Sequence, residues 1–330
     1  MQYECVITKT PLRISFFGGS TDYINFIKKN GTTIISTSID KYVYLIVKKH
    51  GKQYPDKYRI TYSSVEKVNK IENISNDIVR EAIKKFKIYF PISITIVNDI
   101  PAGSGLGSSS VFTIGLCKAI RKLLGLKINN KILLNDAIDI EINRLKNPIG
   151  IQDYLPALYG SLRVYNIDKR VNIENLKVNN YINQKIFKNL FLLWTGSFRD
   201  ASIILKDQKK IIDKKDTYFN EIKKYSIDTK NILNLKKFDL NLFGEKLINS
   251  WEIKKKLSNK IFNRKLKKIE IDIINSGSLG YKLLGAGGEG FFLVLGNKSC
   301  YEFLKNKYHK ESVIKINCEE NPSLFLYLKK

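Results

Sequence analysis

Residues 101 to 110 read PAGSGLGSSS, and this glycine- and serine-rich segment limits the possible folds of the chain more than any other. The alternating stretch SITIVND at 93 to 99 precedes it and predicts a strand. After it, apolar residues recur at helical spacing until Gly125 and predict a helix. Glycines let backbone N–H groups approach an anion closely, and a helix N-terminus attracts negative charge. The order strand, glycine loop, helix therefore predicts a phosphate-binding loop.

This loop differs from two common phosphate-binding motifs. No lysine follows its last glycine, as a GxxxxGK[ST] loop requires. Gly103, Gly105 and Gly107 also lack the spacing of the dinucleotide-binding GxGxxG pattern. A glycine turn without a ligand is the alternative, but the run of hydroxyl residues at 108 to 110 favours phosphate binding.

Length and composition indicate a folded protein with two domains. The chain has 330 residues, of which 43% are hydrophobic, and this length suits two cores better than one. No apolar run approaches the roughly 18 residues of a membrane span, so no membrane partner is expected. The stretch MQYECVITKTPLRISFFGG lacks the pattern of a secretory signal, which predicts a cytoplasmic location.

The chain is strongly basic, with 57 Lys+Arg against 31 Asp+Glu and a net charge of +26. Such a charge keeps open a nucleic-acid-binding protein with a degenerate nucleotide site. The lysines are spread over the whole chain, however, and form no basic block interleaved with aromatic residues, so solvated helix faces are the preferred interpretation and no nucleic acid is expected.

Cysteine and histidine are sparse. The four cysteines show no CxxC spacing, which argues against a zinc site or a disulfide framework. The two histidines, His50 and His309, stand in unpromising contexts, so any catalytic proton transfer is expected to fall to a carboxylate.

Further periodic segments predict the order of elements along the chain. A second helix is predicted from about 130 to 146, where Asn147-Pro148 ends it, and lysine-rich helices are predicted over roughly 200 to 275. The segment LLGAGGEGFFLVLG is a second glycine cluster that runs into a strand. Strands are also predicted at 5–17, 41–48, 162–167, 189–196 and near the closing SLFLYLK. A polar stretch places a domain boundary between 180 and 188, giving domains 1–184 and 185–330.

Three residues have the chemistry of a phosphoryl transferase, which needs magnesium ligands and a group that orients or deprotonates the acceptor hydroxyl. Ser109 lies at the predicted helix entrance and Glu141 on the second helix, where both are candidate magnesium ligands. Asp153 follows a loop in NPIGIQDYLPALYG and is a candidate base. Glu141 can equally be a surface carboxylate, and Asp153 a helix N-cap.

The segment TPLRISFFGGSTDY near the N-terminus offers a cation and an acidic turn. Arg13 lies in the predicted strand, and Gly18, Gly19 and Asp22 lie in the turn after it. Arg13 can stabilise transferred charge in a cleft or pair structurally with any carboxylate. Asp22 can accept hydrogen bonds from sugar hydroxyls.

Three glycine-containing segments resemble, in chain order, the three motifs of the GHMP kinase superfamily: TPLRISFFGG, PAGSGLGSSS and LLGAGGEGFF. This superfamily includes galactokinases, homoserine kinases, mevalonate kinases and phosphomevalonate kinases. The resemblance covers the chain from Arg13 to about Leu295. Within the superfamily, PLRISFFGGSTDY, GIQDYLPALYGS and LLWTGSFRDASIIL look like segments of the heptose 7-phosphate kinases. The resemblance implies an α+β fold with an N-terminal nucleotide-binding domain and a ferredoxin-like C-terminal domain.

The resemblance also implies the cofactors ATP and Mg²⁺ and a phosphorylated sugar as substrate. Asp153 would be the catalytic aspartate with Arg13 beside it, and Ser109 and Glu141 would hold the metal. The residues implied to bind the nucleotide are Pro101, Gly103, Ser104, Gly105, Leu106, Gly107, Ser108, Ser109 and Ser110. Those implied to bind or line the substrate site are Gly18, Gly19, Ser20, Asp22, Gly285, Gly287 and Gly288.

The implied reaction transfers the γ-phosphoryl group of ATP to the anomeric C1 hydroxyl of D-glycero-α-D-manno-heptose 7-phosphate. The alternative is another GHMP sugar kinase, acting on a fucose-like sugar or a different heptose. Arg199 and then Lys282 are candidates for binding the substrate phosphate, although either can be an ordinary side chain. Glu289 stands where the third motif usually has glycine, and a carboxylate there is unfavourable near phosphates unless it turns outward. A homodimer is compatible with the sequence.

Overall fold

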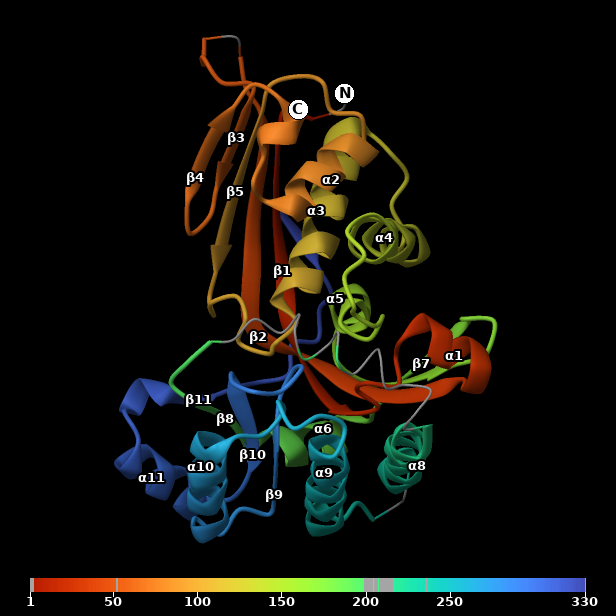
Figure 1. The fold of residues 1–330 in the computed structure, drawn as a ribbon, viewed down its shortest axis with the longest axis vertical. Coiled ribbons are helices and arrows are strands. Elements are labelled where there is room, and N and C mark those ends of the chain that lie inside the picture. Colours follow the sequence, from red (N-terminus) through yellow and green to blue (C-terminus); the bar gives the residue numbers. More distant parts are fainter. Residues whose placement is uncertain are drawn as a thin grey trace.

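The computed structural model describes residues 3–51, 53–198, 204, 207, 216–234 and 237–329. The structure combines helices with strands in two sheets, so the predicted two-domain α+β architecture is confirmed (Figure 1). The larger of two clusters of buried side chains includes residues of both sheets, so the two domains pack closely together. The larger sheet holds most of the N-terminal half, and the smaller sheet lies below it in this view.

The larger sheet has eight strands, with the path β12-β1-β2-β5-β3-β4; off this path, β6 pairs with β2, and β7 pairs with β6. Strand β2 pairs with β1 along one side. Along its other side, its first part pairs with β6 and its second part with β5. The strands of this sheet are β1 (Cys5–Phe17), β2 (Thr32–Lys49), β3 (Tyr58–Thr61), β4 (Val65–Val68), β5 (Ile92–Asn98), β6 (Leu162–Ile167), β7 (Ile173–Lys177) and β12 (Leu324–Lys329).

Helix α3 (Ser108–Leu124) lies against β1 and β2 and is the central helix of this domain (Figure 1). Most of its side chains are buried, and Gly115 admits the close approach of Thr10 and Leu45, because a Cβ there would lie 2.7 Å from Thr10 Oγ1. The remaining helices of this region are α1 (Ile24–Asn30), η1 (Ile71–Asn73), α2 (Asp77–Lys85), α4 (Asn130–Ala137), η2 (Ile138–Arg144), α5 (Tyr154–Tyr159) and α6 (Asn180–Phe187).

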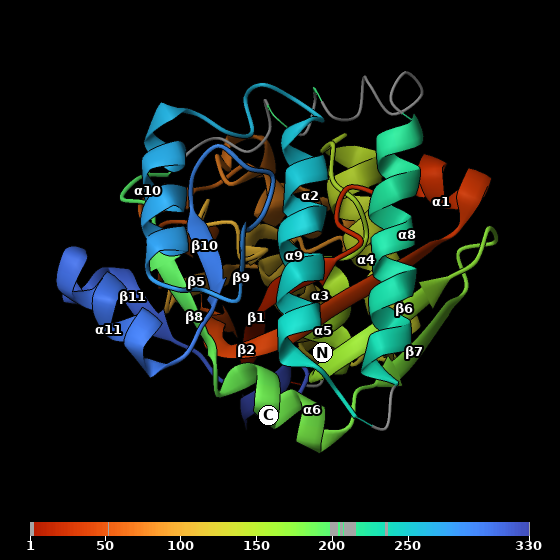
Figure 2. The ribbon, with the colours of Figure 1, turned by 90° about the horizontal axis from the view of Figure 1, so that it is seen from below.

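The smaller sheet is antiparallel with the order β11-β8-β10-β9. Its strands follow a β-α-β-β-α-β sequence with spatial order 4-1-3-2, which is the ferredoxin-like arrangement that was expected. The central FFLVL strand is fully buried, and helices α8, α9 and α10 lie beside one another in Figure 2. The elements are β8 (Leu190–Trp194), α8 (Asp216–Leu233), α9 (Leu240–Lys255), α10 (Arg264–Asn275), β9 (Gly280–Leu283), β10 (Phe291–Leu295), α11 (Lys298–Lys307), η3 (Lys310–Ser312) and β11 (Val313–Lys315).

Two features bear on the predicted boundary between residues 184 and 185. The boundary lies inside α6, and the last strand, β12, returns to pair with β1 of the larger sheet. The chain therefore crosses between the sheets twice, and the predicted domain limits stay a prediction. Among the described residues, no helix is both long and apolar enough to cross a membrane.

The helix predicted over 130 to 146 changes its winding midway. It begins as α4 and continues as the π-helical stretch η2 up to Arg144, just before the predicted stop at Asn147-Pro148. A π-helical turn is a rare, wide turn that often occurs at functional sites. This turn carries Glu141.

Candidate active site

The glycine loop opens directly into α3. Gly103, Gly105 and Gly107 have φ angles of +78°, +86° and +73°, a region that side chains with a Cβ rarely adopt. Gly107 is the N-cap of α3, and no side chain caps the helix there. The amides of the first turn are therefore left for another acceptor, and this helix end favours an anion.

The loop also contacts the second glycine cluster, which comes from the other sheet. A Cβ on Gly105 would lie 2.9 Å from the carbonyl oxygen of Leu284, and a Cβ on Gly285 would lie 2.6 Å from the Cα of Gly105. Only glycine permits this backbone approach on both sides. The two glycine segments therefore form one continuous wall where the domains meet.

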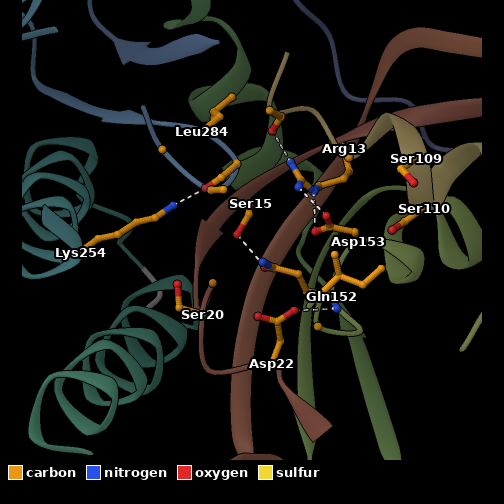
Figure 3. Close-up of a pocket in the computed structure, with 18 of the residues that line it drawn as sticks. Arg13, Ser15, Ser20, Asp22, Ser109, Ser110, Gln152, Asp153, Lys254 and Leu284 are labelled. Atoms are coloured by element: carbon orange, nitrogen blue, oxygen red, sulfur yellow. Dashed lines mark hydrogen bonds and ion pairs between the residues drawn. The ribbon is translucent and has the colours of Figure 1, made fainter. Parts of the chain in front are cut away.

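Arg13 and Asp153 form a bidentate pair at the centre of the pocket (Figure 3). The guanidinium donates from Nε to Oδ1 at 2.9 Å and from Nη2 to Oδ2 at 2.8 Å. Its third nitrogen, Nη1, donates to the carbonyl oxygen of Gly105 at 2.6 Å. Asp153 occupies the N-cap position of α5, as the alternative expected, but its side chain makes no capping hydrogen bond there. Arg13 links the glycine loop to this carboxylate.

Ser109 and Glu141 meet beside the helix N-terminus. The Ser109 hydroxyl donates to Glu141 Oε2 at 2.8 Å. The Glu141 side chain is fully buried rather than a surface carboxylate, and burial raises its pKa to about 7. Its other oxygen, Oε1, has no hydrogen-bond partner among the described residues.

An unpartnered buried carboxylate oxygen next to a serine hydroxyl suits a hard divalent cation such as Mg²⁺. Within the described part of the chain, no group of three or more His, Cys, Asp or Glu side chains could hold a metal alone. A magnesium ion at Ser109 and Glu141 would thus complete its oxygen shell with phosphate oxygens and water. The residues present fit that requirement.

The turn after β1 supplies the opposite side of the pocket. Asp22 is buried and accepts a hydrogen bond from the backbone N–H of Gln152 at 3.2 Å. Burial, and then the nearby charge of Asp153, raise the pKa of Asp22 to about 7. Ser15 Oγ donates to the Gln152 side chain at 2.8 Å, which orients that amide in the pocket.

Two buried lysines face the pocket from the smaller domain. Lys282 on β9 is 5% exposed and donates from Nζ to the carbonyl oxygen of Phe16 at 2.7 Å. Lys254 on α9 is 8% exposed and donates to the carbonyl oxygen of Gly285. Burial lowers the pKa of Lys254 to about 8 and that of Lys282 well below its ordinary value.

The pocket gathers most of the residues singled out from the sequence, though not all. Six of the described ones do not line it: Pro101, Ser104, Leu106, Gly18, Gly288 and Glu141, which lies behind Ser109 and contacts its hydroxyl. Ser104 and Leu106 turn inward and are fully buried, and Gly18 packs against the backbone of Thr33. Arg199 lies outside the described residues. The residues that do line it are Arg13, Gly19, Ser20, Asp22, Gly103, Gly105, Gly107, Ser108, Ser109, Ser110, Asp153, Lys282, Gly285 and Gly287.

The pocket also contains residues that sequence reasoning missed or left open. The pocket is also lined by Gln152, Ser15 and Lys254. Of these, only Gln152 could have been found from the sequence, because it is adjacent to the candidate base Asp153. Glu289, the departure in the third motif, also lines the pocket. This departure from the motif therefore lies in the wall of the cleft.

Comparison with known proteins assigns the chain to a family. Residues 73–161 match the family model described as the GHMP kinases N terminal domain. The chain is also similar to the D-glycero-alpha-D-manno-heptose 7-phosphate kinase of Campylobacter jejuni, with 30% identity over 322 residues, covering 92% of this chain and 93% of the relative. The chain belongs to the GHMP kinases.

This GHMP kinase is therefore a phosphotransferase with an alcohol as acceptor, and its family uses ATP as phosphate donor. It is a sugar kinase, since its similarity extends to a galactokinase of Thermotoga neapolitana with 22% identity over 94% of this chain and 96% of the relative. The same fold is found in the crystal structure of a D-glycero-D-manno-heptose 1-phosphate kinase from Bacteriodes thetaiotaomicron. That structure has a TM-score of 0.77 and 20% identity, and the match covers 98% of this chain and 100% of that one.

Proposed function

We propose that this kinase transfers the γ-phosphoryl group of ATP to the anomeric C1 hydroxyl of D-glycero-α-D-manno-heptose 7-phosphate, giving the 1,7-bisphosphate. The observation that carries the proposal is the Arg13–Asp153 pair, which stands between the glycine loop and the turn that holds Asp22. The 30% identity to a heptose 7-phosphate kinase over nearly the whole chain supports this choice of sugar.

In this proposal the glycine loop holds the phosphates of ATP. The amides at the N-terminus of α3 donate hydrogen bonds to oxygens of the β- and γ-phosphates, and Arg13 lies where charge spreads during transfer. Mg²⁺ bound at Ser109 and Glu141 would neutralise phosphate charge. Burial raises the pKa of Glu141, and a bound cation would oppose that shift by stabilising the charged carboxylate.

Asp153 orients the acceptor hydroxyl and takes its proton as the phosphoryl group arrives. A sugar hydroxyl is a poor nucleophile, so its alignment with the γ-phosphorus contributes much of the rate. Arg13 holds both carboxylate oxygens of Asp153 and so sets the direction in which they point. Asp22 and the backbone of Gly19 and Ser20 bind the hydroxyl groups of the sugar.

The test is a panel of acceptors assayed for ADP release with MgATP. The panel contains the heptose 7-phosphate, the unphosphorylated heptose, fucose and galactose. We expect the highest kcat/KM with the heptose 7-phosphate and a product that carries a phosphate at C1 by phosphorus NMR. Higher kcat/KM with fucose or galactose would instead support the alternative of another GHMP sugar kinase.

The alternative of a basic nucleic-acid-binding protein has a separate test. Such a protein would be retained on DNA in a salt-dependent manner and would release no ADP with any sugar. The paired catalytic groups favour the kinase. The cytoplasm remains the predicted location, and a homodimer remains compatible with the sequence.

A further inference from the structure

Lys254 is a buried cation at the wall of the active-site pocket. It lies in the last turn of α9, where the surrounding sequence WEIKKK is that of a solvated helix face. The folded chain instead buries this one lysine and leaves Lys255, its neighbour, to pair with Glu252 and Glu270.

The Lys254 ammonium has a carbonyl oxygen as its hydrogen-bond acceptor and, among the described residues, no ion pair with a carboxylate. The carboxylates that attract it through space are Asp22 and Asp153, and Arg13 opposes them. Asp153 is already paired with Arg13, and the raised pKa of Asp22 leaves that group only partly charged near neutral pH. A buried charge without a paired counter-ion is costly, so an anionic ligand would complete this site.

Lys282 on β9 is a second buried lysine of the smaller domain that lines the pocket. Its ammonium is also buried, bonds to a backbone carbonyl and faces the same pocket. The charges of Lys254 and Arg13, added to burial, lower the pKa of Lys282. The smaller domain therefore presents two buried amino groups to the pocket, and a bound anion would favour the charged form of each.

The position of Lys254 identifies which anion it meets. The Ser109 hydroxyl contacts Glu141 at the metal-binding end, whereas Lys254 contacts Gly285 of the second glycine cluster. In the view of Figure 3, the Arg13–Asp153 pair lies between Ser109 and Lys254. The phosphates of ATP occupy the Ser109 end, so the anion near Lys254 belongs to the acceptor.

We propose that Lys254 binds the phosphate group already carried by the acceptor sugar and so determines the preference for a phosphorylated substrate. This role rests on the proposed function, because it requires an acceptor with a phosphate remote from the reacting hydroxyl. Lys254 is then a specificity residue contributed by the smaller domain.

The experiment compares wild-type enzyme with Lys254→Met on the heptose 7-phosphate and on the same heptose without its phosphate. We expect kcat/KM for the phosphorylated sugar to fall about 100-fold, because a buried partner of a charged group is lost. For the unphosphorylated sugar, kcat/KM changes less than about threefold, and so does the KM for ATP, since neither ligand reaches this ammonium. Lys246→Met, on the same helix but outside the pocket, is the matched control and should retain the wild-type preference.

The outcomes separate the two proposals. A wild-type enzyme with equal kcat/KM on both sugars contradicts the proposed substrate and, with it, the role of Lys254. A wild-type preference that survives in Lys254→Met contradicts the role of Lys254 alone. Equal losses on both sugars would also overturn it. If Lys254→Met does not fold, Lys254→Arg and Lys254→Gln test the same role. Only the arginine variant is expected to retain the preference for the phosphorylated sugar, and equal preference in both variants would contradict the role of Lys254.

Discussion

At the scale of single residues, the proposed chemistry depends on Asp153. Asp153→Asn keeps the size of the side chain but removes the negative charge that aligns and deprotonates the acceptor. We expect kcat to fall by about 100-fold or more while ATP binds within about threefold of wild type. Steady-state kinetics and a fluorescent-nucleotide titration measure the two quantities. Asp77→Asn, an exposed carboxyl on α2, is the control, and near-normal turnover of Asp153→Asn would remove Asp153 from this role.

Asp22 makes stability depend on pH. Its pKa is about 7 in the folded protein, through burial and then the charge of Asp153, against an ordinary value of 3.8. Between these values the folded state binds a proton that the unfolded state has released, so the free energy of unfolding falls as pH rises from about 4 to about 7. Glu141 contributes with the same sign, since its pKa is also raised to about 7.

We therefore predict that Asp22→Asn loses less stability than wild type over this pH range, by on the order of 2 to 4 kcal/mol. Urea unfolding of the ligand-free protein at pH 5 and pH 7.5 measures the difference. Wild-type and variant stabilities that change in parallel with pH would contradict the prediction.

At the scale of elements, the glycine loop and α3 act as one unit. Gly105→Ala places a Cβ 2.9 Å from the Leu284 carbonyl oxygen at a φ of +86°. We expect a loss of about 2 kcal/mol in stability and at least a tenfold weaker affinity for ATP, because the loop must move away from its wall. Thermal unfolding and nucleotide titration report these effects.

The matched control is Gly125→Ala at the other end of α3. Gly125 has a φ of +73°, so alanine is strained there too, but the site lies outside the pocket. Its stability should fall similarly while ATP affinity stays within about twofold of wild type. Equal losses of affinity in both variants would show that the Gly105 effect comes from general destabilisation.

At the scale of the whole molecule, strands from the two ends of the chain pair at one edge of the larger sheet. Strand β12 pairs with β1, and the hydroxyls of Thr10 and Ser323 share a buried hydrogen bond of 2.8 Å. A chain that ends at Pro322 loses this strand and leaves Thr10 without its partner. We expect it to be several kcal/mol less stable, or to aggregate, when assayed by circular dichroism. Leu326→Ala, at an exposed position of β12, should cost less than about 0.5 kcal/mol.

Much of the element order was predictable because it is encoded locally. The period of apolar residues marks α3, and the PAGSGLGSSS segment predicts where the helix begins and why an anion would bind there. The buried run FFLVL predicts β10 at the centre of its sheet. The π-helical turn that carries Glu141 has no such local signal, and neither has the burial of that carboxylate.

The sequence by itself determined the glycine loop with the strand before it and the helix after it, and it supplied the residue types that phosphoryl transfer needs, because these depend on neighbours along the chain. Only the tertiary structure decided that the Asp153 carboxylate pairs with Arg13, 140 residues away, and makes no capping hydrogen bond to α5. It also decided that Lys254, in a helix that reads as a surface helix, is buried facing the pocket. Burial and long-range pairing arise from how the two sheets pack, and no local period encodes them.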